Sequence, residues 1–451
     1  MGEGDWELSK KTHRTISRRK VVKGGFTALA ALAAPAVLPN TAFARTGELR
    51  ILRWKNFVAA SEAWFNDVFV KEWAEANGVN VSVTSVGLGE INERAAAEAR
   101  EGEGHDLVLF VGPRPVLEDE VIDHGDVIRE CENRYGKVSP AVRRSCLNTR
   151  TGKYHGFPES FFPTMVTYRK DLWDAVGKAP VSWEDIRKGG RAIRLLHGSP
   201  LGISFAPEHN SEHSLRALLN SFGSFVQDEN GSVALDNANT VEALNFAKAL
   251  FEETMTEEVM SWGPPSNNQF MLAGAGNLTI DTMSIIRAAE ARDLEVNRHL
   301  SLSLLPEGPN GRVGPMFGLN TFVIWKFAKN RENAQKFLVD YMSRYEENSM
   351  LGGYQNIAVY PQSAQNLEQF ALMENVVPGR YEPLLNVFDT MINLGHPGSS
   401  NAAIDEVLAG GFIPRMFSSV VTGQESPDQA VARTVAGIAP IFEKWRDAGK
   451  I

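Results

Sequence analysis

The first part of the chain alternates short apolar segments with longer segments whose apolar residues recur every three or four positions. Residues 49–54, 79–83 and 106–111 are short apolar or alternating runs, which is the pattern of β-strands. Residues 61–76 and 90–100 carry apolar side chains at helical spacing, with charged residues on the opposite face. Strands separated by helices of this length usually pair in the same direction, so the pattern predicts a parallel α/β sheet.

Ligands in such sheets bind beyond the carboxyl ends of the strands. Residues 54–57 and 111–114 leave two of the predicted strands. These two segments are where we first expect contacts with a ligand.

The rest of the chain predicts further helices and one clear strand. Ser182 has the form of an N-cap residue that opens a helix, because Asp185 follows three positions later. Residues 239–253 and 331–342 have amphipathic helical patterns, residues 317–325 resemble a strand, and residues 402–448 are mainly helical. No internal repeat or low-complexity linker separates these segments, which is typical of domains that share several chain crossings.

The N-terminus has the three parts of an export signal. A basic segment containing Arg18 and Arg19 precedes an apolar stretch at residues 24–38, and Ala42-Phe43-Ala44 follows. The paired arginines are similar to those of twin-arginine signals, with cleavage expected before Arg45. The apolar stretch is shorter than the roughly 20 residues of a membrane-spanning helix, contains Pro35 and is followed by Pro39. We therefore expect residues 1–44 to be removed and the mature chain to be a periplasmic protein without a membrane segment.

Composition and charge narrow the possible partners. A chain of 451 residues exceeds what one hydrophobic core usually organises, so two domains are expected. The net charge is −9, and the first 44 residues hold seven basic and three acidic residues, which leaves −13 for the mature chain. Such an acidic surface disfavours binding to nucleic acid or to an anionic membrane.

The chain has two cysteines, Cys131 and Cys146. In an oxidising compartment the pair predicts one disulfide bond, which would contribute roughly 3 kcal/mol of stability by loop-closure estimates. The alternative is two free thiols that pack as small hydrophobic side chains.

Five segments in order resemble the carbohydrate-type (family 1) extracellular solute-binding proteins of ABC importers. They are Gly102–Phe110, with His105 where the family has Pro, then Gly152–Pro158, Tyr168–Leu172, Ala179–Glu184, and Gly318–Ile324 followed by the helix that contains Ala334–Leu338. The resemblance covers nearly all of residues 47–451. Each segment alone is a weak signal, and the ordered set is a strong one.

The resemblance implies a periplasmic binding protein fold, with two α/β lobes, a hinge of three segments and a ligand cleft between the lobes. We expect residues 45–161 and 316–352 in the first lobe, and residues 162–315 and 353–451 in the second. The hinge crossings should lie near residues 160–164, 314–318 and 352–356. In this family the lobes close on a small molecule and the closed form docks onto the permease subunits of the importer. We expect a monomer without cofactor, metal or catalytic activity.

Candidate ligand-binding residues come from the strand ends, the crossings and one loop rich in turn residues. Aromatic side chains stack on sugar rings, while Asn, Asp and Arg bond to sugar hydroxyls. The candidates are Trp54, Asn56, Arg114, Glu159, Phe161, His209, Trp262, Asp281, Asn320 and Tyr354. For Trp54 a place in the hydrophobic core is the alternative, and for Arg114 a solvated surface position.

Asp281 marks a departure from the family pattern. Sugar receptors of this family often carry a tryptophan shortly after the strand that here reads Leu278-Thr279-Ile280, whereas this chain continues with Asp281. The chain thereby lacks an aromatic ring on which a sugar could stack and has a carboxylate in its place. This exchange disfavours a large oligosaccharide as the ligand. A sugar or polyol is the expected ligand, and an amine or other small cation is the alternative.

Two other functions remain as alternatives. Residues 209–213 fit the H-x-x-E-H pattern, in which His209 and His213 would bind zinc and Glu212 would act as a base in a metal-dependent hydrolase. That reading requires a third metal ligand, and the sequence does not single one out. A receptor that reports the same ligand to a chemoreceptor is the other alternative.

Overall fold

The computed structural model describes residues 47–316, 318–373 and 376–451. The predicted export signal and its cleavage site lie outside the described residues. For His209 we place only the backbone.

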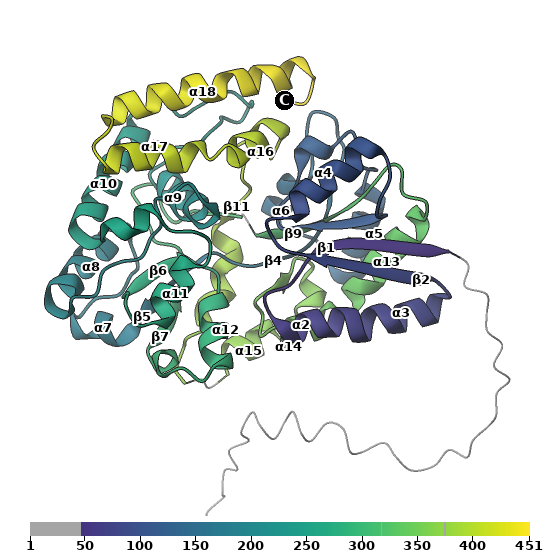
Figure 1. Ribbon diagram of the computed structural model, residues 1–451, viewed down its shortest axis with the longest axis horizontal. Helices are drawn as coiled ribbons and strands as arrows, with labels where there is room; N and C mark the ends of the chain where they lie inside the picture. The colour runs from purple at the N-terminus through teal and green to yellow at the C-terminus, as the bar shows by residue number, and fades with distance from the viewer. Residues whose placement is uncertain (1–46, 317, 374–375) are drawn as a thin grey trace, which may run out of the picture. The chain divides into compact units, whose positions relative to one another are not determined.

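Six strands form the larger sheet, in the order β10-β4-β9-β3-β1-β2 (Figure 1). The strands are β1 (Glu48–Trp54), β2 (Asn80–Val86), β3 (Leu107–Phe110), β4 (Phe157–Phe161), β9 (Leu319–Ile324) and β10 (Ile357–Ala358). The three strands predicted from the first part of the chain are confirmed, and β1 pairs in parallel with both β2 and β3. The other three are antiparallel to their neighbours, so the sheet is mixed rather than wholly parallel.

Helices predicted between these strands are also present. The segment between β1 and β2 is one helical stretch, assigned as α2 (Ala59–Ala63), η1 (Trp64–Phe69) and α3 (Val70–Asn77). Further helices that belong to this part of the chain are α4 (Ile91–Glu101), η2 (Pro115–Leu117), α5 (Gly125–Tyr135), α6 (Pro140–Cys146), α13 (Arg331–Ser343), α14 (Tyr345–Leu351), η5 (Pro361–Ser363), α15 (Leu367–Ala371) and η6 (Glu382–Thr390). Gly78 ends α3 in the left-handed conformation (φ 63°), which glycine adopts without steric cost.

A second sheet has three antiparallel strands in the order β6-β5-β7. They are β5 (Met165–Arg169), β6 (Leu278–Asp281) and β7 (Leu300–Ser303). The helices around it are α7 (Lys170–Ala175), α8 (Trp183–His197), α9 (His209–Ser221), α10 (Ala238–Thr254), η3 (Glu257–Met260), α11 (Ser266–Leu272), α12 (Ser284–Ala291), η4 (Glu295–Arg298), α16 (Ala402–Ala409), α17 (Phe412–Val421) and α18 (Pro427–Asp447). The Ser182 N-cap is confirmed, since its side chain and that of Asp185 form a reciprocal capping box at the start of α8.

The chain passes between the two sheets at three places. The first joins β4 to β5, and the second leads from β7 through β8 (Gly314–Pro315) to β9. The third was expected near residues 352–356, but β10 pairs with β4 and therefore stays in the larger sheet. The chain reaches the second core only after β11 (Met391–Ile392), which pairs with β8. The larger sheet thus includes a strand from beyond residue 352, and the remaining lobe boundaries stay predictions.

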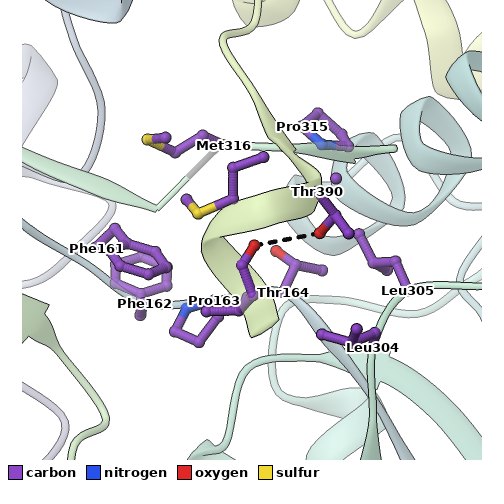
Figure 2. Close-up of a pocket in the computed structure, with 12 residues that line it drawn as sticks. Phe161, Phe162, Pro163, Thr164, Leu304, Leu305, Pro315, Met316 and Thr390 are labelled. Atoms are coloured by element: carbon purple, nitrogen blue, oxygen red, sulfur yellow. Dashed lines mark hydrogen bonds between the residues drawn. The ribbon is translucent and has the colours of Figure 1, made fainter. Parts of the chain in front are cut away.

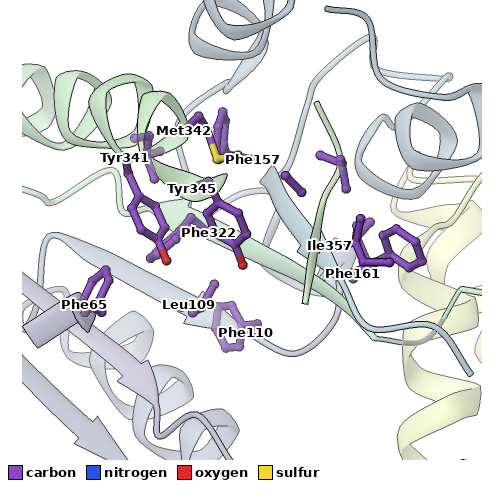
Figure 3. Packing of buried hydrophobic residues seen from close by; sticks show 14 of the residues in the cluster. Phe65, Leu109, Phe110, Phe157, Phe161, Phe322, Tyr341, Met342, Tyr345 and Ile357 are labelled. Atoms are coloured by element: carbon purple, nitrogen blue, oxygen red, sulfur yellow. The ribbon is translucent and has the colours of Figure 1, made fainter. Parts of the chain in front are cut away.

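Aromatic side chains fill the core between the larger sheet and the helices that follow β9 (Figure 3). Tyr341 on α13 lies 5.3 Å from Phe65 and 6.3 Å from Phe322 between ring centroids, both edge to face. Buried aromatic pairs of this geometry contribute about 0.5–1.5 kcal/mol beyond their burial. Among the helices of the described residues, none combines the length and apolar character that a membrane-spanning segment requires.

Both cysteines lie in the described part of the chain, and both are free thiols. The predicted disulfide is therefore absent, and the alternative of two packed thiols describes the structure. Cys131 on α5 and Cys146 at the end of α6 are each 0% exposed in the hydrophobic core. Burial raises the pKa of each thiol to about 12, which keeps both protonated.

Candidate solute-binding site

All three chain crossings line one small pocket (Figure 2). Its walls are residues 161–164, 304–305 and 314–316 with Val387, Thr390 and Met391, and it encloses about 20 Å³, room for roughly one water molecule. Phe161 packs edge to face against Phe388, with ring centroids 4.7 Å apart. The candidate Phe161 therefore belongs to the hinge, as expected, and is 1% exposed.

Next to the hinge, three aromatic rings gather where β1 ends. The Trp54 ring lies 5.6 Å from that of Phe57 and 6.5 Å from that of Phe162. Trp54 is 2% exposed, and its indole N–H has no hydrogen-bond partner within the described residues. Phe57, in contrast, is 68% exposed. An aromatic surface with a free donor beside it has the two properties that a sugar ring needs from its receptor.

Glu62 holds the loop that follows Trp54. Its carboxylate accepts hydrogen bonds from the Asn56 backbone N–H (3.1 Å) and the Ser85 hydroxyl (2.9 Å), and the Arg53 guanidinium lies 3.3 Å away. Burial alone would raise the pKa of Glu62, but the Arg53 charge and these hydrogen bonds outweigh it and hold the pKa below its ordinary value. The side chain of Asn56 is 7% exposed and accepts from the Val58 N–H, so it shapes the loop as well.

The second sheet contributes a wall of carboxylates and amides. Asp281 ends β6 and accepts a hydrogen bond from the Asn267 amide (2.7 Å). Asn210 donates to the Asn267 oxygen (3.2 Å), and its backbone N–H donates to Glu208 (2.9 Å). Burial raises the pKa of Asp281 to about 6, and the nearby Glu208 charge adds to this effect.

Two further contacts join the two sets of residues. The Thr164 hydroxyl lies 3.3 Å from His213 Nδ1, and the Gln355 amide donates to the Thr282 hydroxyl (3.0 Å). The oxygen of this amide, Gln355 Oε1, is buried and has no described partner. With the pairing of β10 to β4, these contacts link residues around both sheets into one connected set. We call it the solute ring, and it consists of Trp54, Phe162, Thr164, His213, Asn210, Asn267, Asp281, Thr282 and Gln355.

Two candidates are buried below this region, in the larger sheet. Glu159 is 2% exposed, and burial raises its pKa to about 7 against the opposing charge of Arg53. Asn320 is 1% exposed and donates to the Ser160 hydroxyl (3.0 Å).

Three other candidates contact protein groups outside the solute ring. Arg114 forms an ion pair with Asp405 (Nε–Oδ2 3.1 Å), Trp262 packs on Phe270 (5.1 Å), and the Tyr354 hydroxyl donates to Glu346. The sequence pointed to Trp54, Asn56 and Asp281 and to the loop at residues 262–268 that carries Asn267, but it did not single out Gln355. The positions of Asn267 and Gln355 follow from which loops meet in space.

The H-x-x-E-H segment forms the first turn of α9, which begins at His209. Glu212 is 4% exposed and lies 3.4 Å from the Arg216 guanidinium on the same helix. Burial raises the pKa of Glu212 to about 7, opposed by the Arg216 charge. Among the described side chains, no group of three or more His, Cys, Asp and Glu residues is arranged to hold a metal ion.

Two sheets joined by a three-segment hinge define a two-lobed periplasmic binding protein fold. The family model for bacterial extracellular solute-binding proteins matches residues 59–347, and the chain belongs to this family. Its fold class, which we predicted from the sequence, is thereby confirmed.

Several known proteins are similar to this chain. The arabinooligosaccharide-binding protein of Bacillus subtilis (strain 168) is 22% identical over 324 residues, which are 68% of this chain and 72% of that protein. A solute-binding protein of Thermotoga lettingae TMO, solved with α-D-tagatose, superposes with a TM-score of 0.72 at 15% identity, covering 88% of this chain and 100% of that one. A maltose-bound protein of T. maritima gives a TM-score of 0.71 at 18% identity, covering 87% and 99% of the two chains.

Proposed function

We propose that this chain captures a sugar or polyol between its two lobes in the periplasm and passes it to the permease subunits of an ABC importer. The protein acts by binding and release and carries out no chemical reaction on the solute. The relatives named above for arabinooligosaccharide, tagatose and maltose support a sugar as the solute class.

The observation that carries the proposal is the composition of the solute ring. Among the described residues, Trp54 Nε1 is a buried donor without a partner and Gln355 Oε1 is a buried acceptor without a partner, and Phe57 offers an exposed ring next to Trp54. A buried polar atom without a partner costs roughly 1–3 kcal/mol, and a sugar hydroxyl that satisfies it recovers this free energy on binding. Apolar rings next to unsatisfied polar groups match the faces and edges of a sugar.

The test begins with a thermal-shift panel of arabinose, tagatose, maltose and sorbitol. A ligand present at about 100 times its Kd stabilises the folded state by roughly 2.7 kcal/mol, which is readily measured. Titration calorimetry then compares Phe57→Ala with Leu195→Ala, since both side chains are largely exposed (68% and 75%) but only Phe57 adjoins the solute ring. Both variants should keep the wild-type free energy of unfolding within about 0.5 kcal/mol.

Only Phe57→Ala should weaken solute binding, by about tenfold if the ring stacks on the sugar. Trp54→Ala should weaken binding further, and it should also lose about 3–5 kcal/mol of stability because the ring is buried. Equal affinities for Phe57→Ala, Leu195→Ala and the wild type would contradict the assignment of this site.

A further inference from the structure

We infer that the solute carries a protonated amino group, as an amino sugar does, and that Asp281 and Glu208 receive it. This inference rests on the proposed function and specifies the solute class.

Asp281 belongs to the solute ring, and Glu208 is bonded to the backbone of another of its members, Asn210. Asp281 ends β6, and Glu208 precedes α9, where its side chain caps the helix. The amides of Asn267 and Asn210 connect them, through hydrogen bonds of 2.7 Å to Asp281 and 3.2 Å between the two amides. The two acidic groups therefore lie on neighbouring segments that are fixed to each other.

Within the described residues, Glu208 accepts the backbone N–H groups of Asn210 and Ser211 at the start of α9, and Asp281 accepts the Asn267 amide and the Thr282 N–H. Among the described lysine and arginine side chains, none has a nitrogen within 4.0 Å of either carboxylate. Arg216 on α9 is directed to Glu212, and Arg114 is paired with Asp405. Burial raises the pKa of both Glu208 and Asp281, which is the expected response of carboxylates without a cationic partner. A ligand cation would supply the missing charge.

The remaining groups suit an ammonium ion. An ammonium group has three N–H donors and no acceptor. Asp281, Glu208 and the unpartnered Gln355 Oε1 provide acceptors on adjacent segments, and Gln355 is 5% exposed with its amide held on Thr282. Neutral sugars would leave the charge of the carboxylate pair unbalanced.

The test uses pairs of molecules that differ by one hydroxyl-to-amine exchange. Calorimetry near neutral pH compares D-glucose with D-glucosamine, D-galactose with D-galactosamine, and sorbitol with 1-amino-1-deoxysorbitol. For each pair that binds, we expect the Kd of the amine to be at least about tenfold lower than that of its neutral partner.

Asp281→Asn should reduce that preference to about twofold, because the substitution removes the negative charge but keeps an acceptor oxygen. Glu208→Gln retains a side-chain acceptor for the helix cap and serves as the second variant. Asp174→Asn on α7 is the control, because that carboxylate pairs with Lys170 away from the solute ring. Thermal midpoints of the empty variants report their folding.

Each outcome decides between the two proposals. If neutral members bind as tightly as their amines, or if Asp281→Asn and Glu208→Gln both leave the amine preference unchanged, the amine inference is wrong and the sugar-binding function stands. If no member of any pair binds, the amine inference is wrong, and the sugar-binding function fails with it only if no sugar of the thermal-shift panel binds either.

Discussion

Several carboxyl groups of this chain are buried away from solvent, and burial shifts their pKa values. Burial raises the pKa to about 7 for Glu159 and Glu212 and to about 6 for Asp281. Glu159 has an oxygen without a partner, and the Arg53 charge near it only partly offsets the loss of solvent. The residue lies on β4, which leads directly into the hinge.

Stability should therefore depend on the protonation of Glu159. Its pKa is about 7 when folded and close to the ordinary 4.5 when unfolded, so between these values the folded state holds more protons. The free energy of unfolding consequently falls as pH rises through this window. Glu159→Gln does not titrate, and it should gain stability relative to the wild type from pH 4.5 to pH 7, on the order of 3 kcal/mol at most.

Urea unfolding at a series of pH values measures this difference directly. Glu101→Gln, an exposed position on α4, is the matched control and should follow the wild-type profile. A constant difference between Glu159→Gln and the wild type across the series would show that Glu159 does not titrate in this range.

Single elements were the scale at which the sequence was most informative. Periodicity predicted β1, β2, β3, α4 and α13, because each has a face or a whole surface that must be apolar. It could not predict the six-stranded order of the larger sheet or the place of β10, since a strand of two residues has no period to detect. For the same reason the third hinge segment was expected too early in the chain.

Candidate site residues were predictable where a strand end fixes the position. Trp54 and Asp281 end β1 and β6. The resemblance to the solute-binding family predicted a ligand contact at Trp54, and Asp281 was singled out as a departure from the family pattern. Asn267 and Gln355 lie on segments far apart in sequence, 267 on α11 and 355 before β10, and only tertiary contacts bring them to the solute ring. Arg114 was expected to contact the ligand, but it forms an ion pair with Asp405 on α16, 3.1 Å away. No local sequence pattern indicates this pairing.

The burial of one thiol on α5 and one on α6 leads to a prediction about their reactivity. Cys131 and Cys146 are buried in the hydrophobic core, and neither forms a disulfide bond. A thiol reagent should therefore find no reactive cysteine in the folded protein and two per chain after denaturation without reductant. One disulfide and no titratable thiol in periplasmic protein would contradict the free pair.

Contacts between the lobes extend beyond the solute ring at the scale of the whole molecule. Lys450 near the C-terminus reaches Asp119 (2.7 Å), and Asn148 donates to the Lys450 carbonyl (3.2 Å). Together with Arg114–Asp405, these bonds connect the helices that follow β11 to the larger sheet. Lobe closure on a solute must preserve these bonds or break them. We therefore expect solute binding to be coupled to the relative positions of the lobes.

The central claim is that one solute is held by both lobes at once. Small-angle X-ray scattering of residues 45–451, with and without the tightest-binding sugar of the panel, tests it most directly. We expect the radius of gyration to fall when the site is filled, and Phe57→Ala to require more sugar for the same change. A radius of gyration that stays the same in saturating sugar, in protein that calorimetry shows to be bound, would contradict capture between the lobes.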